Sequence, residues 1–145
     1  MAVPVQSKRD RSRLEDYLEA IYHLSKEKGY VSTVDISDHL GVTPSTVSGM
    51  VGKLARGGYL EHERYRGMKL TESGVRVARS VIHRHETIEE LLSMLGVNKK
   101  AAYEDAEGIE HHVQPVTIEK LERLVAFLRR NPDFLEEIGK ERPER

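Results

Sequence analysis

The sequence predicts a mainly α-helical protein in which a winged helix-turn-helix domain is followed by an all-helical domain. Three observations support this fold class. Apolar residues recur at helical spacing along most of the chain. Two short helical segments are joined by a turn at Gly41, and the second of them opens with Thr43 and Pro44. The segment from Tyr59 to Gly74 instead has the pattern of two strands joined by a tight turn.

Composition limits the kinds of chemistry available. The chain has 145 residues, of which 38% are hydrophobic and 32% charged, as in a globular protein that stays in solution. It has no cysteine, so any metal must be held by oxygen and imidazole nitrogen. No apolar run approaches the roughly 18 residues of a membrane span, and the N-terminus lacks the apolar stretch of a signal peptide. We therefore expect no membrane contact and a cytoplasmic location.

The N-terminal elements follow from helix start and stop signals. The first dozen residues are polar and basic, and they predict a loose arm over residues 1–13. A helix with Leu14 and Leu18 on its apolar line then runs to a stop at Gly29. Ser32 and Thr33 cap a short second helix. The third helix, capped by Thr43, ends at the pair Gly57-Gly58, and residues 1–73 are predicted to form one domain.

The outer face of the third helix is small or basic, which packing alone does not require. Small side chains let a recognition helix lie close to base edges in the major groove of double-stranded DNA. The residues expected to contact DNA are Thr43, Pro44, Ser45, Thr46, Ser48, Gly49 and Lys53, with Gly52 on the same face. The alternative is a helical hairpin without a ligand.

The predicted hairpin after this helix is the wing, with its tight turn at Arg66-Gly67. Its cations Arg64, Arg66 and Lys69 would reach phosphates or the minor groove. The formal net charge is only −1, so this positive charge is local. Local charge is sufficient for DNA binding, since phosphate contacts depend on nearby cations and not on the overall balance.

The second half, residues 74–145, is predicted to be a helical domain. Thr71 caps a long helix that runs to Gly96, and Asn98 begins the next helical segment. Pro115 breaks that segment, and Thr117 caps a further helix that Pro132 closes. A last short helix leads into the tail. The apolar line of the long helix exceeds what one small winged domain can cover, which predicts a homodimer.

Potential metal ligands are concentrated in the stretch A-E-G-I-E-H-H. Glu107, Glu110 and His111 stand at i, i+3 and i+4, so they would project from one face of a helix. Asp16 and Glu19 form an i, i+3 pair on the first helix. The alternative is a solvated polar face in both places. His85 lies within an apolar line, where a histidine is more often part of the core than a ligand.

Several motifs carry a family resemblance: D-Y-L-E-A-I-Y, Y-R-G-M-K-L-T, H-R-H-E and E-G-I-E-H-H. They resemble the manganese transport regulators of the diphtheria toxin repressor family, in the short form, from Leu14 to about Phe127. The resemblance implies repression of manganese-uptake genes by a homodimer on an approximately palindromic operator. It also implies a site between the domains for two Mn(II) ions per subunit, with the ligands Asp16, Glu19, His85, Glu107, Glu110 and His111. The choice of His85 over His83, and of His111 over His112, rests mainly on the motif match.

Charge and ligand type agree with that site. Four carboxylates would balance two divalent ions, and oxygen-rich ligation without sulfur suits Mn(II). An iron- or zinc-responsive repressor of the same family remains an alternative. A repressor with an organic ligand leaves six convergent ligands unexplained, and a di-metal enzyme lacks an obvious general base outside the ligand set. We therefore expect neither catalysis nor an organic substrate. Gly49 and Gly52 replace longer polar residues of a relative, so base contacts do not transfer directly.

Overall fold

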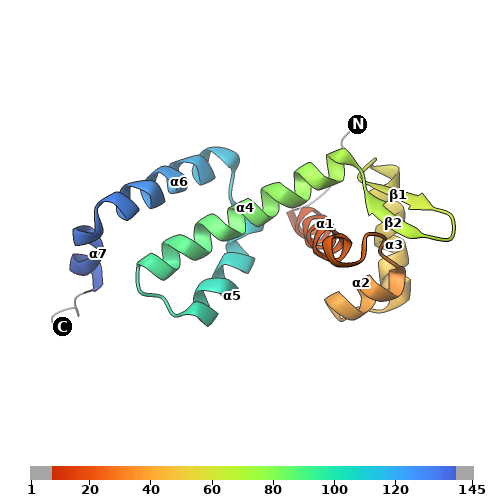
Figure 1. The fold of residues 1–145 in the computed structure, drawn as a ribbon, viewed down its shortest axis with the longest axis horizontal. Coiled ribbons are helices and arrows are strands. Elements are labelled where there is room, and N and C mark those ends of the chain that lie inside the picture. The colour runs from red at the N-terminus through yellow and green to blue at the C-terminus, as the bar shows by residue number, and fades with distance from the viewer. Residues whose placement is uncertain (1–7, 140–145) are drawn as a thin grey trace. The chain divides into compact units, whose positions relative to one another are not determined.

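The computed structural model describes residues 8–139 and divides into two compact units, Met1–Ile82 and His83–Arg145. The division falls within the long helix α4, whereas the sequence-based boundary after residue 73 falls near the start of that helix (Figure 1). The elements in order are α1 Lys8–Lys28, α2 Thr33–Leu40, α3 Pro44–Arg56, β1 Leu60–Glu63, β2 Gly67–Leu70, α4 Glu72–Met94, α5 Lys99–Ile109, the 3₁₀ turn η1 Glu110–His112, α6 Pro115–Arg130 and α7 Pro132–Gly139.

The helix-turn-helix begins and ends at the residues that the sequence indicates. Ser32 caps α2 in a capping box, in which its hydroxyl accepts from the Asp35 amide and the Asp35 carboxylate accepts from the Ser32 amide. Gly41 ends α2 in the left-handed conformation, with φ of 65°. The Thr43 hydroxyl accepts from the Thr46 amide at 3.3 Å, and Pro44 follows as the first helical residue of α3.

The wing is a two-stranded antiparallel hairpin in which Leu60 pairs with Leu70 and Glu63 with Gly67. Its loop is residues 64–66, so the turn predicted at Arg66-Gly67 is displaced, and Gly67 already belongs to β2. The loop turns through Tyr65, which has a positive φ of 69°. Val31 and Met68 exchange two backbone hydrogen bonds of 2.9 and 2.8 Å, which join the hairpin to the segment between α1 and α2.

A close backbone contact fixes the start of α4. The Thr71 hydroxyl donates to the Gly58 carbonyl at 2.6 Å and accepts from the Gly74 amide at 3.2 Å, so Thr71 caps this helix as predicted. A Cβ at Gly74 would lie 2.1 Å from the carbonyl oxygen of Tyr59. Only glycine therefore fits where α4 passes the end of the hairpin.

The core of the N-terminal unit draws on α1, α2, α3, the wing and the start of α4. Its fully buried members include Leu18, Ile21, Ile36, Leu54 and Met68. The C-terminal unit has a much smaller cluster, formed by Ile88, Ala106 and Ile118 with Leu92, Val113 and Leu121 packed against it.

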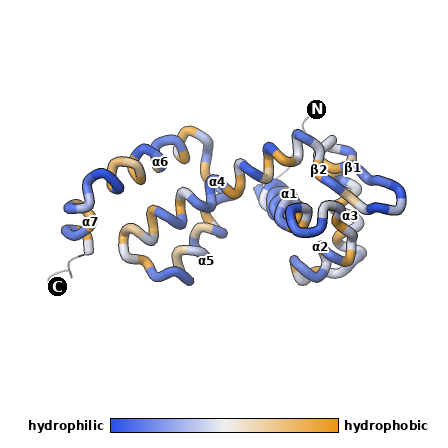
Figure 2. The backbone as a smooth tube through the Cα atoms, in the orientation of Figure 1, coloured by the Kyte–Doolittle hydropathy of each residue, from blue (hydrophilic) through white to orange (hydrophobic). Residues whose placement is uncertain are grey.

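Large apolar side chains stay exposed in the C-terminal unit. Along α6 and α7 they are Val116, Leu124, Phe127, Phe134 and Ile138. Figure 2 shows hydrophobic positions recurring along both helices, whereas the loop between β1 and β2 is hydrophilic. Among residues 8–139, no helix is long and apolar enough to cross a membrane.

Two helix starts differ from the sequence-based expectation. Helix α1 begins at Lys8, so residues 8–13 are helical and do not form the predicted loose arm. An i, i+4 ion pair of 3.0 Å between Arg11 and Glu15 stabilises this first part of the helix. Helix α6 begins at Pro115, not at Thr117, because proline is accommodated at the first helical position. The rest of the predicted arm, residues 1–7, and the tail 140–145 lie outside the described residues.

Candidate metal centre and nucleic-acid interface

The C-terminal unit contains a cluster of potential metal ligands around the buried side chain of His85. The His85 side chain is 9% exposed, and its Nδ1 atom lies 2.6 Å from a carboxylate oxygen of Glu110 and 3.2 Å from one of Glu107. One ligand atom from each of the three residues lies within 4.8 Å of the other two. Imidazole nitrogen and carboxylate oxygen form a donor set that fits a divalent cation of the Mn(II) type.

Local structure explains how Glu107 and Glu110 reach one imidazole. Glu107 lies in the last turn of α5, and the chain then tightens into the 3₁₀ turn that carries Glu110 and His111. The spacing predicted one continuous α-helix through this stretch. That prediction is wrong, because the helix ends at Ile109 and a 3₁₀ turn follows. Glu110 is fully buried and His111 is 8% exposed, so the two side chains that follow the helix both face inward.

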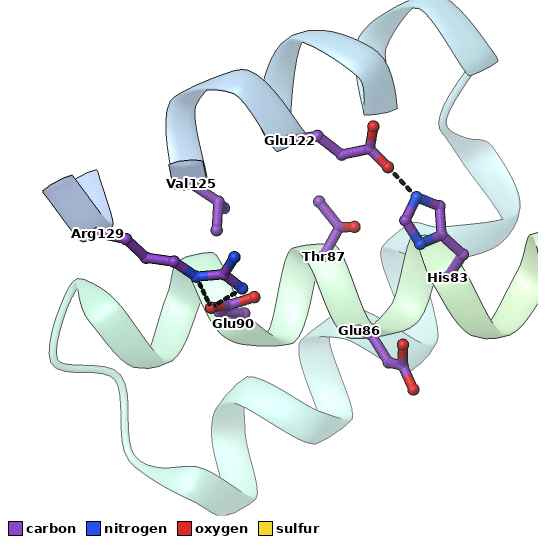
Figure 3. Close-up of a pocket in the computed structure, with 7 residues that line it drawn as sticks. All are labelled: His83, Glu86, Thr87, Glu90, Glu122, Val125 and Arg129. Carbon is purple, nitrogen blue, oxygen red and sulfur yellow. Dashed lines mark hydrogen bonds and ion pairs between the residues drawn. The ribbon is translucent and has the colours of Figure 1, made fainter. Parts of the chain in front are cut away.

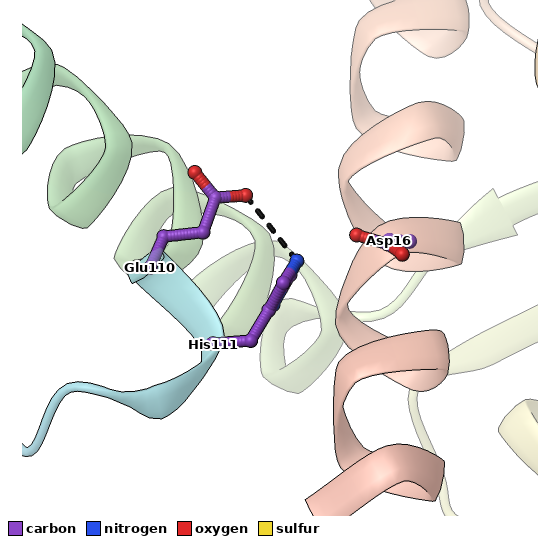
Figure 4. Close-up of side chains that lie close together, drawn as sticks. All are labelled: Asp16, Glu110 and His111. Carbon is purple, nitrogen blue, oxygen red and sulfur yellow. Dashed lines mark ion pairs between the residues drawn. The ribbon is translucent and has the colours of Figure 1, made fainter. Parts of the chain in front are cut away.

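His111 lies beside Glu110, with its Nε2 atom 3.4 Å from a Glu110 carboxylate oxygen (Figure 4). Figure 4 also draws Asp16 on α1, which belongs to the N-terminal unit. Asp16 and Glu19 are half-buried and stand one helical turn apart on that helix. A Glu19 carboxylate oxygen lies 3.7 Å from the Nε2 atom of His23.

The electrostatics of the His85 cluster favour a cation. Burial alone would lower the pKa of His85, but the carboxylates of Glu110, Glu107 and Glu89 outweigh it and raise the pKa above its ordinary value. The imidazole thus carries a proton more readily than an isolated histidine does. A metal ion at Nδ1 would take the place of that proton and satisfy the same carboxylates.

The histidines left out of the predicted site have other surroundings. His112 is exposed, whereas His83 on α4 pairs with Glu122 on α6. His83 and Glu122 both line a cavity of about 360 Å³ between α4 and α6. Figure 3 shows this pair at one end of the lining, with Glu90 and Arg129 paired further along.

Two neighbours of His85 were missed in the sequence. Glu89 lies one turn further along α4, with a carboxylate oxygen 3.0 Å from the Nε2 atom of His85. The ring of Tyr103 on α5 contacts the imidazole edge to face, with centroids 4.9 Å apart. The i, i+4 spacing of His85 and Glu89 was a visible signal, but helices carry many such pairs on solvated faces.

The outer face of α3 is open to solvent. Exposed side chains there are those of Pro44, Ser45, Thr46, Ser48 and Lys53, and Gly49 is also exposed. The Thr43 hydroxyl is instead engaged in capping and in contacts with Ser45 and Thr46. Such a face, small and basic, can approach the floor of a DNA groove.

The cations of the wing differ in their surroundings. Lys69 lies 3.2 Å from Glu63, and Arg66 lies 3.7 Å from the same carboxylate while its guanidinium covers the ring of Tyr30. Arg64 stacks on the ring of Tyr65. Of the three predicted phosphate contacts, Arg66 and Lys69 thus share one acidic partner in the protein itself.

Two family models together match most of the chain. Residues 11–68 match the N-terminal DNA-binding domain of iron-dependent repressors, and residues 71–138 match the metal-binding and dimerisation domain of the same proteins.

Curated relatives match over 79% to 91% of their length. The chain is 42% identical over 125 residues to the HTH-type transcriptional regulator MntR of Lysinibacillus sphaericus, which covers 86% of this chain and 90% of the relative. It is 43% identical over 130 residues to MntR of Shouchella clausii, and the match covers 88% of this chain and 91% of the relative. MntR of Bacillus pumilus is 44% identical over 114 residues, covering 79% of each.

Solved structures of metal-dependent regulators share the fold. The manganese regulator SloR matches with a TM-score of 0.70 and 31% identity over 79% of this chain. A manganese-dependent transcriptional repressor in complex with manganese matches with a TM-score of 0.68 and 28% identity, also over 79% of this chain. The chain spans only about half the length of these two proteins, at 54% and 53%.

Proposed function

Because the chain belongs to the iron-dependent, or diphtheria toxin, repressor family of DNA-binding transcriptional regulators, we propose that Mn(II) activates it to bind double-stranded DNA. The family is one of regulators and not of enzymes, in line with the sequence-based expectation. The N-terminal unit supplies the helix-turn-helix and wing, and the C-terminal unit supplies the metal-binding and dimerisation domain.

The observation that carries the proposal is the group formed by the buried side chains of His85 and Glu110 with the partly exposed Glu107. Each contributes one ligand atom to a volume small enough for a single ion. A fully buried carboxylate such as that of Glu110 is costly in a protein interior unless a cation balances it. The donor atoms are oxygen and nitrogen, which suit Mn(II). This group therefore supports a metal site more directly than a structural role.

The full ligand set that we propose adds Asp16, Glu19 and His111. The support for Asp16 and Glu19 is their motif, D-Y-L-E-A-I-Y, and their spacing of one helical turn, which directs two carboxylates the same way. Four carboxylates and two neutral imidazoles balance two divalent ions, so we propose two Mn(II) ions per subunit.

As a metal-activated repressor, the protein would act as a homodimer on an approximately palindromic operator in the cytoplasm. Each protomer would place α3 in one major groove, and the wing would contact the adjacent backbone. Genes for manganese uptake are the targets that this regulation would serve, since repression at sufficient Mn(II) limits further import.

A DNA-binding titration tests the proposal. Fluorescence anisotropy of a labelled duplex is followed while Mn(II), Fe(II) or Zn(II) is added, and bound metal is measured in parallel. We expect tight binding only with metal, two ions per subunit, and the strongest response with Mn(II). A stronger response to Fe(II) or Zn(II) would assign the alternative metal, and DNA binding that ignores all three would reject metal activation.

A pair of histidine variants sharpens the titration. His85→Ala removes a proposed ligand, whereas His83→Ala removes a histidine on the same helix that pairs with Glu122 instead. We expect His85→Ala to lose metal-dependent DNA binding and His83→Ala to retain it. The reverse result would place the metal in the cavity between α4 and α6.

A further inference from the structure

The two ring nitrogens of His85 have different partners. Nδ1 faces Glu110 and Glu107, at 2.6 and 3.2 Å, and Nε2 faces Glu89, at 3.0 Å. Glu89 is one helical turn from His85 on α4, so its carboxylate meets the ring from the helix itself. The potential ligand group that includes His85 contains Glu107 and Glu110 but not Glu89.

A metal-binding imidazole must be neutral at the nitrogen that binds. A neutral ring carries one N–H, so ligation through Nδ1 requires the proton on Nε2. Glu110 favours the opposite tautomer, because its carboxylate lies 2.6 Å from Nδ1 and would accept a proton carried by that nitrogen. An acceptor at Nε2 opposes that tendency and also fixes the rotation of the ring.

We infer that Glu89 is a positioning residue that accepts the Nε2 proton of His85 and so presents Nδ1 to the metal. The inference rests on the proposed function, since it concerns metal binding at His85. Glu89 does not itself touch the ion. Its carboxylate contacts Nε2, whereas Glu107 and Glu110 contact Nδ1 on the other side of the ring.

The surroundings of Glu89 fit this role. Its side chain is 28% exposed, against 9% for His85, so it lies at the border between the buried ring and solvent. It lines an open cavity of about 410 Å³ with Lys99, Lys100, Tyr103 and Glu104. Because Tyr103 packs edge to face against the imidazole, the ring is held by a carboxylate and an aromatic neighbour as well as by the ligand group.

Three variants separate positioning from charge. Glu89→Ala removes the acceptor, and Glu89→Gln keeps an acceptor oxygen but removes the negative charge. Glu86→Gln is the matched control, because it removes one negative charge from the same helix next to His85, and Glu86 lines the α4–α6 cavity instead. Circular dichroism establishes that each variant is folded.

Calorimetric titration with Mn(II) gives the affinity. For Glu89→Ala we expect a loss of about 10- to 100-fold, the usual effect of removing the partner of a metal-binding histidine. Glu89→Gln should recover most of that affinity, because it keeps an acceptor for the Nε2 proton. Glu86→Gln should stay within about twofold of the parent, because Glu86 lines the α4–α6 cavity and is not the proposed partner of the imidazole. Equal losses in Glu89→Gln and Glu89→Ala would show a charge effect and overturn the inference.

Nitrogen-15 NMR of the His85 ring supplies a readout that fold stability does not move. In the parent loaded with diamagnetic Zn(II), we expect Nδ1 bound to metal and Nε2 protonated. In Glu89→Ala we expect a mixture of the two ring nitrogens as ligand. Unchanged ring nitrogens in Glu89→Ala would overturn the inference. If the parent itself shows no metal-induced change at His85, the proposed function fails instead.

Discussion

The two units of the molecule bury apolar surface very differently. The N-terminal unit has an extended cluster that includes Leu18, Ile36 and Leu54 and draws on its helices and its hairpin alike. The buried cluster of the C-terminal unit has three members, Ile88, Ala106 and Ile118, while Phe127 and Phe134 on α6 and α7 stay exposed.

The difference indicates how each unit is stabilised. A unit with an extended core folds from its own side chains, as a DNA-reading domain requires. A unit with a small core and exposed apolar helices depends on additional partners. Residues 71–138 match a metal-binding and dimerisation domain, so the two partners are a metal ion and a second copy of the chain.

Core truncation gives the largest expected effect. Leu54 is fully buried in the N-terminal unit, so Leu54→Ala should lower its free energy of unfolding by about 3 kcal/mol. Ile118→Ala in the C-terminal unit should cost about half as much, because a small cluster near the surface collapses more easily around the gap. Hydrogen exchange in each unit measures both values. Equal losses would contradict the difference between the two cores.

Metal addition should act mainly on the C-terminal unit. Mn(II) at about 100 times its dissociation constant should raise the free energy of unfolding by about 2.7 kcal/mol for each site that it fills. We expect amide protection to increase in α5 and η1 more than in α3. His85→Ala should abolish the increase. If α3 gained as much protection as α5, metal would not distinguish the two units.

Dimerisation should depend on the exposed aromatic pair of α6 and α7. The rings of Phe127 and Phe134 lie with centroids 5.5 Å apart, and both are partly exposed. Phe127→Ala should raise the dimer dissociation constant about tenfold, or about 1.4 kcal/mol. Sedimentation velocity measures the change. Tyr65→Ala, which removes an exposed aromatic ring from the wing, should leave the dissociation constant unchanged.

Acid tests the N-terminal unit through its capping box, with the smallest effect. Hydrogen bonds from Lys28 and Ser32 lower the pKa of Asp35 from 3.8 to about 2. The ionised form is favoured by folding, so its stabilisation is complete above pH 3.8 and is lost as the pH falls towards about 2. The stability difference between the parent and Asp35→Asn should shrink across this window in urea unfolding. A difference that stays constant there would contradict the assigned cause.

Local chemistry made the helix-turn-helix predictable from sequence. Ser32, Gly41 and the pair Thr43-Pro44 act within one turn of their own position, so their effect does not depend on distant packing. The family resemblance could be identified for the same reason, because its motifs are short and contiguous. The family models and the curated relatives confirm it. The predicted cap at Thr117 was wrong. A hydroxyl residue two positions after Pro115 resembles a cap, but the helix already begins at the proline.

Geometry beyond one helical turn was not predictable. The spacing of Glu107, Glu110 and His111 suggested one α-helix, but the chain tightens to a 3₁₀ turn after Ile109. The direction of the His85 ring depends on α5 and η1 as well as on α4, and no local pattern reports it. No local pattern therefore distinguishes Glu89 from the other acidic residues of α4 in the sequence.

The contact between Gly74 and Tyr59 sets a limit on how this protein can diverge. If Arg64, Arg66 and Lys69 contact phosphates as proposed, other cations could replace them when the operator changes, since phosphates accept many donors. Gly74 has no such freedom, because any side chain there meets the Tyr59 carbonyl, and Thr71 is tied to both Gly58 and Gly74. In distant relatives the spacing T-x-x-G after two short strands should thus outlast the charges of the wing and mark the start of the long helix.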